Sequence, residues 1–118
     1  MRAREIKFRA WSKATEKMMD WDFIKSHGNL NKLLYLDHVE VMQFTGLTDK
    51  NGKEIYEGDQ LFYAASNHSS MIVKFENGSF VGEGPFNTLP LSQYISATDF
   101  EFIEVIGNIL ETPELLCN

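Results

Sequence analysis

The sequence predicts an all-β fold, and three observations support this prediction. Apolar and charged residues alternate with period two near the N-terminus, as in a half-buried strand. Asn77-Gly78 stands between two apolar runs and is a strong hairpin signal, because both central residues of a type I′ turn need positive φ. Aromatic residues make up 13% of the chain, and they favour strands over helices.

The N-terminal part of the chain is expected to form a β-hairpin followed by a loop. Ile6, Phe8 and Ala10 alternate with more polar neighbours, and a polar stretch at 12–17 separates them from the apolar run 18–21. A hairpin is the simplest account of this order. Residues 25–31 are expected to be a loop. The run 33–36 is either a strand or one helical turn, and 39–44 is a further strand candidate.

The centre of the chain carries two sets of turn residues. Asp49-Lys50-Asn51-Gly52 predicts a tight turn, because Asp can bond its own downstream backbone and Asn and Gly tolerate positive φ. Glu57-Gly58-Asp59 then precedes the next apolar run, at 61–63. The turn near Gly52 is the best candidate for a boundary between two subdomains.

The C-terminal half is expected to be a meander. In the run 71–75, Met71, Val73 and Phe75 share a face, and the strand returns after Asn77-Gly78. A short helical turn is expected near Pro90. The segment 100–109 is the last long strand, and its apolar phase changes, which a bulge or burial of both faces would produce. Thr112-Pro113 predicts one final turn.

Together these elements describe one domain, 1–118, made of two small, packed β subdomains. The expected division separates an N-terminal hairpin region, 1–52, from a C-terminal region, 53–118. The order of strands and turns in the second region resembles small SH3-like barrels. A chain of 118 residues is long enough to fold around such a core without disulfide bonds.

The composition favours a cytoplasmic protein. The single cysteine, Cys117, has no partner for a disulfide and makes no Cys-based metal site. No apolar run approaches the roughly 18 residues that a membrane helix needs, and the charged N-terminus is unlike a signal peptide. We therefore expect no membrane association.

Three blocks of sequence resemble the YopX family of bacteriophage and prophage proteins. They are Glu5-Ile6-Lys7-Phe8-Arg9-Ala10-Trp11 at the start, the stretch from Met42 to Asp59 in the centre, and Val105-Ile106-Gly107-Asn108-Ile109 with Pro113-Glu114-Leu115-Leu116 at the end. The resemblance implies a phage or prophage accessory protein in a bacterial cytoplasm. It supplies no catalytic residue, because the family's biochemical role is not established.

The residues themselves predict no catalytic, cofactor or metal site, and we expect no enzyme. The acids Asp49, Glu54, Glu57 and Asp59 crowd together, but their spacing does not fit a calcium loop. The histidines, at positions 27, 38 and 68, lack the paired spacing of metal ligands. No phosphate-binding glycine loop or nucleophile elbow is present.

The N-terminal hairpin is instead the predicted interaction surface. Residues 1–17 carry six basic and two acidic side chains, so this segment is +4 and the remainder −10. The candidate contact residues are Arg4, Phe8, Arg9, Trp11 and Trp21. We expect a homo-oligomer or binding to an unidentified phage or host protein. The alternative is weak nucleic-acid binding, in which the aromatic residues stack on bases and the cations contact phosphates.

Overall fold

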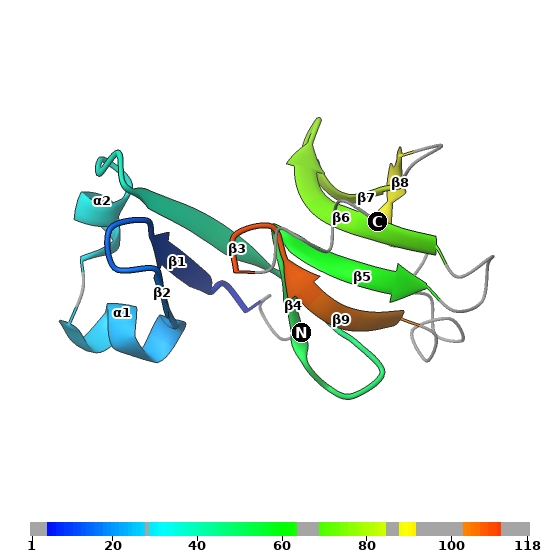
Figure 1. Ribbon diagram of the computed structural model, residues 1–118, viewed down its shortest axis with the longest axis horizontal. Coiled ribbons are helices and arrows are strands. Elements are labelled where there is room, and N and C mark those ends of the chain that lie inside the picture. Colours follow the sequence, from blue (N-terminus) through cyan, green and yellow to red (C-terminus); the bar gives the residue numbers. More distant parts are fainter. Residues whose placement is uncertain (1–4, 28, 64–68, 85–87, 92–102, 112–118) are drawn as a thin grey trace. The chain divides into compact units, whose positions relative to one another are not determined.

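The computed structural model of the protein describes residues 5–27, 29–63, 69–84, 88–91 and 103–111 (Figure 1). This part of the chain is mostly strand with two short helices, so the all-β prediction is confirmed. The chain divides into two compact units, residues 1–44 (unit 1) and residues 45–118 (unit 2). The turn at Gly52, where the sequence suggested a boundary, lies inside unit 2 because its hairpin packs with the later strands.

Unit 1 begins with the expected hairpin. Strand β1 (Phe8–Ser12) pairs with β2 (Lys17–Met19) in antiparallel register, with Trp11 opposite Met18. The turn between them closes with a hydrogen bond from the Glu16 amide to the Ser12 carbonyl, 2.8 Å long. On its other side β1 pairs with β3 (Val39–Thr48), and the sheet has the order β2-β1-β3-β4.

Two helices occupy the segment between β2 and β3. The expected loop at 25–31 is wrong in part, because α1 (Trp21–His27) runs through its start and α2 (Leu30–Leu33) begins before its end. Each helix has an N-terminal cap that the sequence analysis did not weigh. The Asp20 carboxylate accepts a hydrogen bond from the Phe23 amide at 2.8 Å, and the Asn29 side chain accepts one from the Lys32 amide at 3.2 Å. For the run 33–36, the helical alternative agrees better with the structure than the strand alternative, because Leu33 is the last residue of α2.

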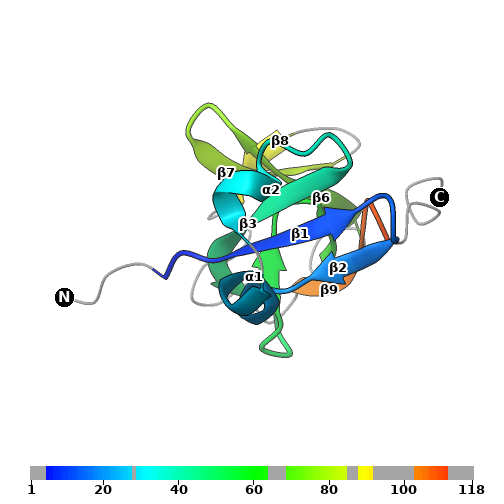
Figure 2. The same cartoon turned by 90° about the vertical axis from the view of Figure 1, so that its left-hand side faces the viewer.

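The core of unit 1 lies between this sheet and the helices. Ala10 is fully buried at the centre of β1, and it packs with Ile24 of α1 and Leu33 of α2. Figure 2 shows α1 lying beside β1 and β2. Because side chains alternate along a strand, the face of β1 that carries Ala10 also carries Phe8 and Ser12. We call this face the inner face. Further apolar residues pack around it: Met19, Trp21, Leu30, Leu36, Val39 and Val41.

Strand β3 continues from unit 1 into unit 2 and changes conformation there. Gly46 has φ of +90°, which a strand residue with a side chain rarely adopts. Beside it, the Thr45 hydroxyl donates to the Ile55 carbonyl at 2.8 Å and accepts a hydrogen bond from the Leu47 amide at 3.1 Å. The hydroxyl thus compensates for the irregular backbone and ties β3 to β4 (Glu54–Tyr56).

The tight turn expected between β3 and β4 is confirmed. The Gly52 amide donates to the Asp49 carbonyl at 3.0 Å, and the Asp49 amide donates to the Lys53 carbonyl at 2.9 Å. Gly52 has φ of +80°, so glycine fits this position without strain. The Asp49 side chain also bonds to the backbone downstream, as the sequence predicted.

Unit 2 contains a five-stranded sheet in which every neighbouring pair is antiparallel. Its strands are β5 (Asp59–Tyr63), β6 (Ser69–Glu76), β7 (Ser79–Glu83), β8 (Thr88–Pro90) and β9 (Ile103–Asn108). Their order is β8-β7-β6-β5-β9, and β6 bends strongly along its length (Figure 1). Pro90 ends β8 and Leu91 is helical, which agrees with the helical turn expected near Pro90. Most of that segment, and the final turn after Thr112, lie outside the described residues.

Two features of this sheet agree with local sequence signals. Asn77 and Gly78 have φ of 51° and 83°, so the predicted type I′ hairpin is confirmed. In β9, Gly107 faces Gln60 while Val105 faces Leu61, which leaves Ile106 as an extra residue. A bulge is therefore present in the last strand. Residues 100–102, where the apolar phase was expected to change, lie outside the described part of the chain.

The core of unit 2 is built from the β4 strand and the five-stranded sheet together. Its buried residues are Ile55, Leu61, Met71, Val73, Leu91 and Ile103. Phe75 shares a face with Met71 and Val73, but it is 50% exposed near the hairpin tip. The core therefore includes the two inner positions of β6 and not the third.

Candidate interaction surface

The structure separates the five candidate contact residues of the N-terminal hairpin. Arg4 lies outside the described residues. Phe8 and Trp21 come together on the inner face, with ring centroids 5.9 Å apart. Trp21 is the first residue of α1 and packs against the core of unit 1. The prediction that Trp21 lies on the hairpin is wrong, because the residue belongs to α1. Its ring contributes to the core of unit 1.

Arg9 and Trp11 lie on the opposite face of β1. The register places Met18 of β2 and Glu40 of β3 on either side of Trp11, and Met42 opposite Arg9. We call the surface formed by Arg9, Trp11, Met18 and Glu40 the outer face. Trp11 and Met18 are both partly exposed there, and Glu40 is exposed. The outer face thus presents apolar surface beside charged groups.

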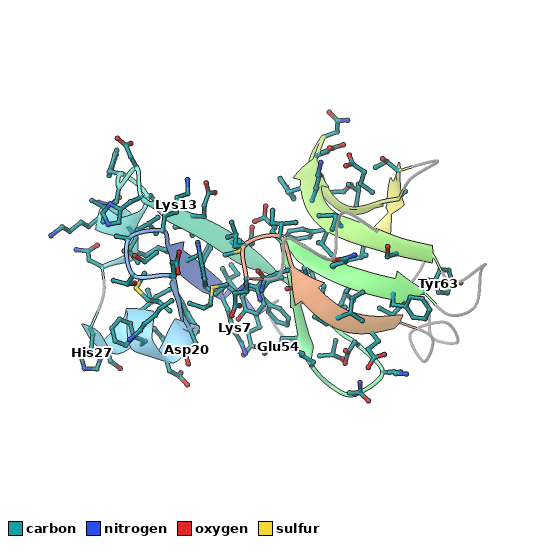
Figure 3. The ribbon with its side chains drawn as sticks, in the orientation of Figure 1. Lys7, Lys13, Asp20, His27, Glu54 and Tyr63 are labelled. Atoms are coloured by element: carbon teal, nitrogen blue, oxygen red, sulfur yellow. The ribbon has the colours of Figure 1, made fainter. Side chains whose placement is uncertain are left out.

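Charged side chains border the outer face along the sheet. The Lys13 ammonium lies 3.2 Å from the Glu40 carboxylate, and both side chains are about half exposed. At the other end of β1, the Lys7 ammonium lies 5.2 Å from the centroid of the Phe44 ring and 3.5 Å from the Glu5 carboxylate. Figure 3 shows Lys7 and Lys13 at opposite ends of the strand. The Lys13–Glu40 pair is exposed and contributes little stability, whereas the Lys7 side chain is 20% exposed beside the Phe44 ring.

The register explains why sequence analysis did not select Met18 and Glu40. Both side chains become neighbours of Trp11 only when the strands pair. Met18 could have been found from the hairpin alone, because a turn of known length fixes the opposing residues. Glu40 lies on β3, and no local signal shows that β3 pairs with β1.

The two units differ strongly in charge. Unit 1 has eight basic and six acidic residues and is +2, whereas unit 2 has three basic and eleven acidic residues and is −8. The basic excess found in the first 17 residues is thus partly offset inside unit 1. Unit 2 carries most of the negative charge of the chain.

Asp49 is a buried carboxylate whose oxygens are used by the backbone. It is 1% exposed. One oxygen accepts hydrogen bonds from the amides of Asn51 and Lys53, at 2.8 and 2.9 Å. The other accepts one from the amide of Val105 at 3.0 Å. Asp49 thus joins the turn before β4 to strand β9.

The Glu57-Gly58-Asp59 segment has a similar structural role. Asp59 is 1% exposed, and its carboxylate accepts a hydrogen bond from the Tyr56 amide at 2.8 Å. The Gly58 amide donates to the Val73 carbonyl at 2.8 Å, and the Gly58 carbonyl accepts from the Ile109 amide at 3.0 Å. Gly58 has φ of +85°. The segment therefore connects β5 to the strands on both of its sides.

No metal-ligand cluster occurs within the described ranges, where no three His, Cys, Asp or Glu side chains gather. His27 stacks on Phe23 of the same helix, with centroids 5.0 Å apart. His68 lies outside those ranges. Neither described helix is long and apolar enough to cross a membrane.

The sequence and structure resemble known proteins over nearly their whole length. The family model described as YopX protein matches residues 7–117. A crystal structure of protein EF1440 from Enterococcus faecalis superposes with a TM-score of 0.69 and is 29% identical in sequence. That alignment covers 97% of this chain and 99% of the other. No curated protein matches the chain.

Proposed function

The chain belongs to the YopX family, and from this premise we propose that it is a non-enzymatic accessory protein of phage or prophage origin that acts by binding proteins. We assign the binding to the outer face of the N-terminal sheet. The proposed setting is the bacterial cytoplasm.

The position of Trp11 is the observation that carries this proposal. Trp21 packs against the core of unit 1 and Phe8 lies beside its ring, but Trp11 is partly exposed on the other side of the sheet. Its neighbours are Met18, which adds apolar area, and Glu40, which is paired with Lys13. An aromatic and a methionine surrounded by charged groups have the composition typical of the centre and rim of a protein interface.

A second copy of the chain is the partner that the charges favour. Unit 2 is −8 and unit 1 is +2, so unit 1 of one copy attracts unit 2 of another. Exposed ion pairs contribute only about 0–1 kcal/mol each, so the affinity must come mainly from burying Trp11 and Met18. A stable interface would need to bury roughly 1,000 Å² or more in total.

The roles of the buried carboxylates support a non-enzymatic protein. Asp49 and Asp59 belong to the sequence motif that defines the family resemblance, and a buried acid is a common catalytic group. Here both carboxylates accept hydrogen bonds from backbone amides that stabilise turns. The central motif is therefore explained by the needs of the fold.

Sedimentation or light scattering of the purified protein at high micromolar concentration tests the proposal. We expect a dimer or larger assembly, and we expect Trp11→Ala to weaken it by about tenfold or more, because a central aromatic contributes most of the affinity. Tyr35→Ala is the matched control, since Tyr35 is an 81% exposed aromatic of the same unit outside the outer face. A strict monomer, or equal weakening by both variants, would contradict the proposal.

Nucleic-acid binding is the second candidate, and the cations near Trp11 favour it. Trp11 is partly exposed on β1, on the same face as Arg9, and an aromatic ring beside a cation resembles the surfaces on which single strands stack. The −8 charge of unit 2 opposes this function. Titration of a labelled single-stranded oligonucleotide decides between the two, because binding that weakens steeply with salt would support the second candidate.

A further inference from the structure

The chain contains the dipeptide Asn-Gly twice, in two turns with different hydrogen bonding. Asn51-Gly52 lies between β3 and β4, and Asn77-Gly78 connects β6 to β7. All four residues are exposed. The difference between the turns has a chemical consequence.

Asn-Gly is the dipeptide in which asparagine loses its side-chain amide nitrogen most readily without an enzyme. The glycine backbone nitrogen attacks the side-chain amide carbon, the bond from that carbon to the amide nitrogen breaks, and ammonia leaves. Water then opens the resulting succinimide ring at either carbonyl and gives aspartate or isoaspartate. Glycine allows this reaction because it has no Cβ to crowd the attacking nitrogen, and its backbone reaches unusual conformations easily.

The turn at Asn51-Gly52 hinders this attack. The Gly52 nitrogen, which would be the nucleophile, already donates a hydrogen bond to the Asp49 carbonyl at 3.0 Å. The Asn51 backbone amide donates to the Asp49 carboxylate at 2.8 Å, and the Lys50 backbone amide donates to the Ile103 carbonyl at 3.0 Å. Rotation of the backbone toward the attacking geometry would break several of these bonds.

The turn at Asn77-Gly78 lacks this restraint. It is the two-residue tip beyond the last pair of the hairpin, Glu76 and Ser79. Among the hydrogen bonds of the described residues, none uses the Gly78 amide. The tip can change conformation while the ladder behind it stays formed, because hairpin ends open locally at low cost.

We propose that Asn77 is a site of spontaneous deamidation and that the Asp49-centred turn protects Asn51. Conversion of Asn77 to aspartate adds one negative charge to unit 2. Conversion to isoaspartate adds a methylene to the backbone of a turn whose geometry depends on positive φ at both residues. Either product alters the hairpin tip next to the Phe75 and Phe80 rings, whose centroids are 5.0 Å apart.

Peptide mapping by mass spectrometry measures both sites in one sample. The full chain is incubated in mildly alkaline buffer, once folded and once in concentrated urea, and digested at intervals. In the folded protein we expect Asn77 to convert at least about tenfold faster than Asn51. The reason is that the hydrogen-bonded turn at Asn51 must open before the Gly52 nitrogen can attack. In urea the two rates should agree within about a factor of two, since the reacting dipeptide is the same and neither turn is formed.

Two results would overturn the proposal. One is equal or faster conversion of Asn51 in the folded protein. The other is a folded protein in which Asn77 stays intact for as long as the urea sample takes to convert. Asn77→Ser serves as the control that identifies the acidic species, because it removes the reacting amide and should abolish the more acidic form seen by isoelectric focusing.

Discussion

Asp49 shows how much of this fold depends on one carboxylate. It accepts hydrogen bonds from three backbone amides while almost completely buried. Hydrogen bonds to a charged group are stronger than neutral ones, and a buried donor that loses its acceptor is costly. The turn between β3 and β4 and the edge of β9 therefore share a single acceptor.

Replacing Asp49 with alanine should destabilise unit 2 by about 2–5 kcal/mol, because up to three amides would lose their acceptor. Urea denaturation measures the change. Asp22→Ala is the matched control, since the Asp22 carboxylate is 91% exposed and its ion pair with Lys25 contributes less than about 1 kcal/mol. Equal midpoints for the two variants would mean that Asp49 has no central role.

The sequence predicted one part of this role and not the other. The bonds from Asp49 to Asn51 and Lys53 are local, so the residue types and spacing of the turn are enough to foresee them. Val105 lies 56 residues away from Asp49. No turn signal contains information about such a distant partner, because the contact between Asp49 and Val105 depends on the order of strands in the sheet.

At the scale of elements, period two and turn chemistry predicted strands at the positions of β1 to β3, β5 to β7 and β9, but β4, β8 and the helices were missed. Asp20 and Asn29 are preferred N-cap residues, and Trp21 and Ile24 are spaced for one helical face. Helices as short as α1 and α2 are marginal by themselves and depend on burial against Ala10. A short segment with weak periodicity therefore gave little basis for choosing helix over loop.

The same limit applied to the candidate site. Trp21 was placed on the hairpin because the apolar run 18–21 was treated as one strand, whereas β2 ends at Met19. The cap at Asp20 turns the chain and brings Trp21 to the inner face. The remaining exposed aromatic of the hairpin, Trp11, was selected correctly as a hairpin residue, and its role in binding stays a prediction.

The β6–β7 hairpin offers a test of the local geometry. Gly78→Val should destabilise unit 2 by about 1–3 kcal/mol, because a β-branched residue resists φ of +83°. No atom lies within 4 Å of the position a Cβ would take, so the cost would come from the backbone alone. Thermal unfolding followed by circular dichroism measures it.

Ser79→Val is the matched control for this variant. It adds the same side chain at the next residue, which is exposed and has strand geometry, where valine is favoured. If the Gly78→Val protein melts at the same temperature as the Ser79→Val control, the result would argue against the type I′ turn.

At the scale of the whole molecule, the uneven charge of the two units is the feature that bears on the proposed self-association. Like charges within unit 2 keep copies apart when they approach by that unit, and unit 1 is the oppositely charged surface available to it. Electrostatic attraction of this kind mainly raises the rate of encounter and sets orientation.

Reversing the charge of two hairpin lysines tests whether unit 1 directs the approach of a second copy. Lys13→Glu with Lys17→Glu should slow association by about tenfold at low salt, and the difference should shrink as salt screens the charges. Stopped-flow light scattering measures the rate. Lys25→Glu with Lys32→Glu changes the net charge equally but on the helices, so it should have a smaller effect. Indistinguishable rates for the two double variants would show that the hairpin charge has no directing role.

The hydrogen bond between Asp49 and Val105, 56 residues apart in sequence, also has a consequence for folding during synthesis. The core cluster of unit 1 lies entirely within the first 44 residues, so it can form while the chain is still leaving the ribosome. The Asp49 carboxylate cannot reach its last amide until Val105 has been synthesised. Until then the central turn is incomplete, and strands β5 to β7 expose an edge that β9 later covers. We therefore expect the two units to acquire their structure at different stages of translation, the second only after β9 has been made.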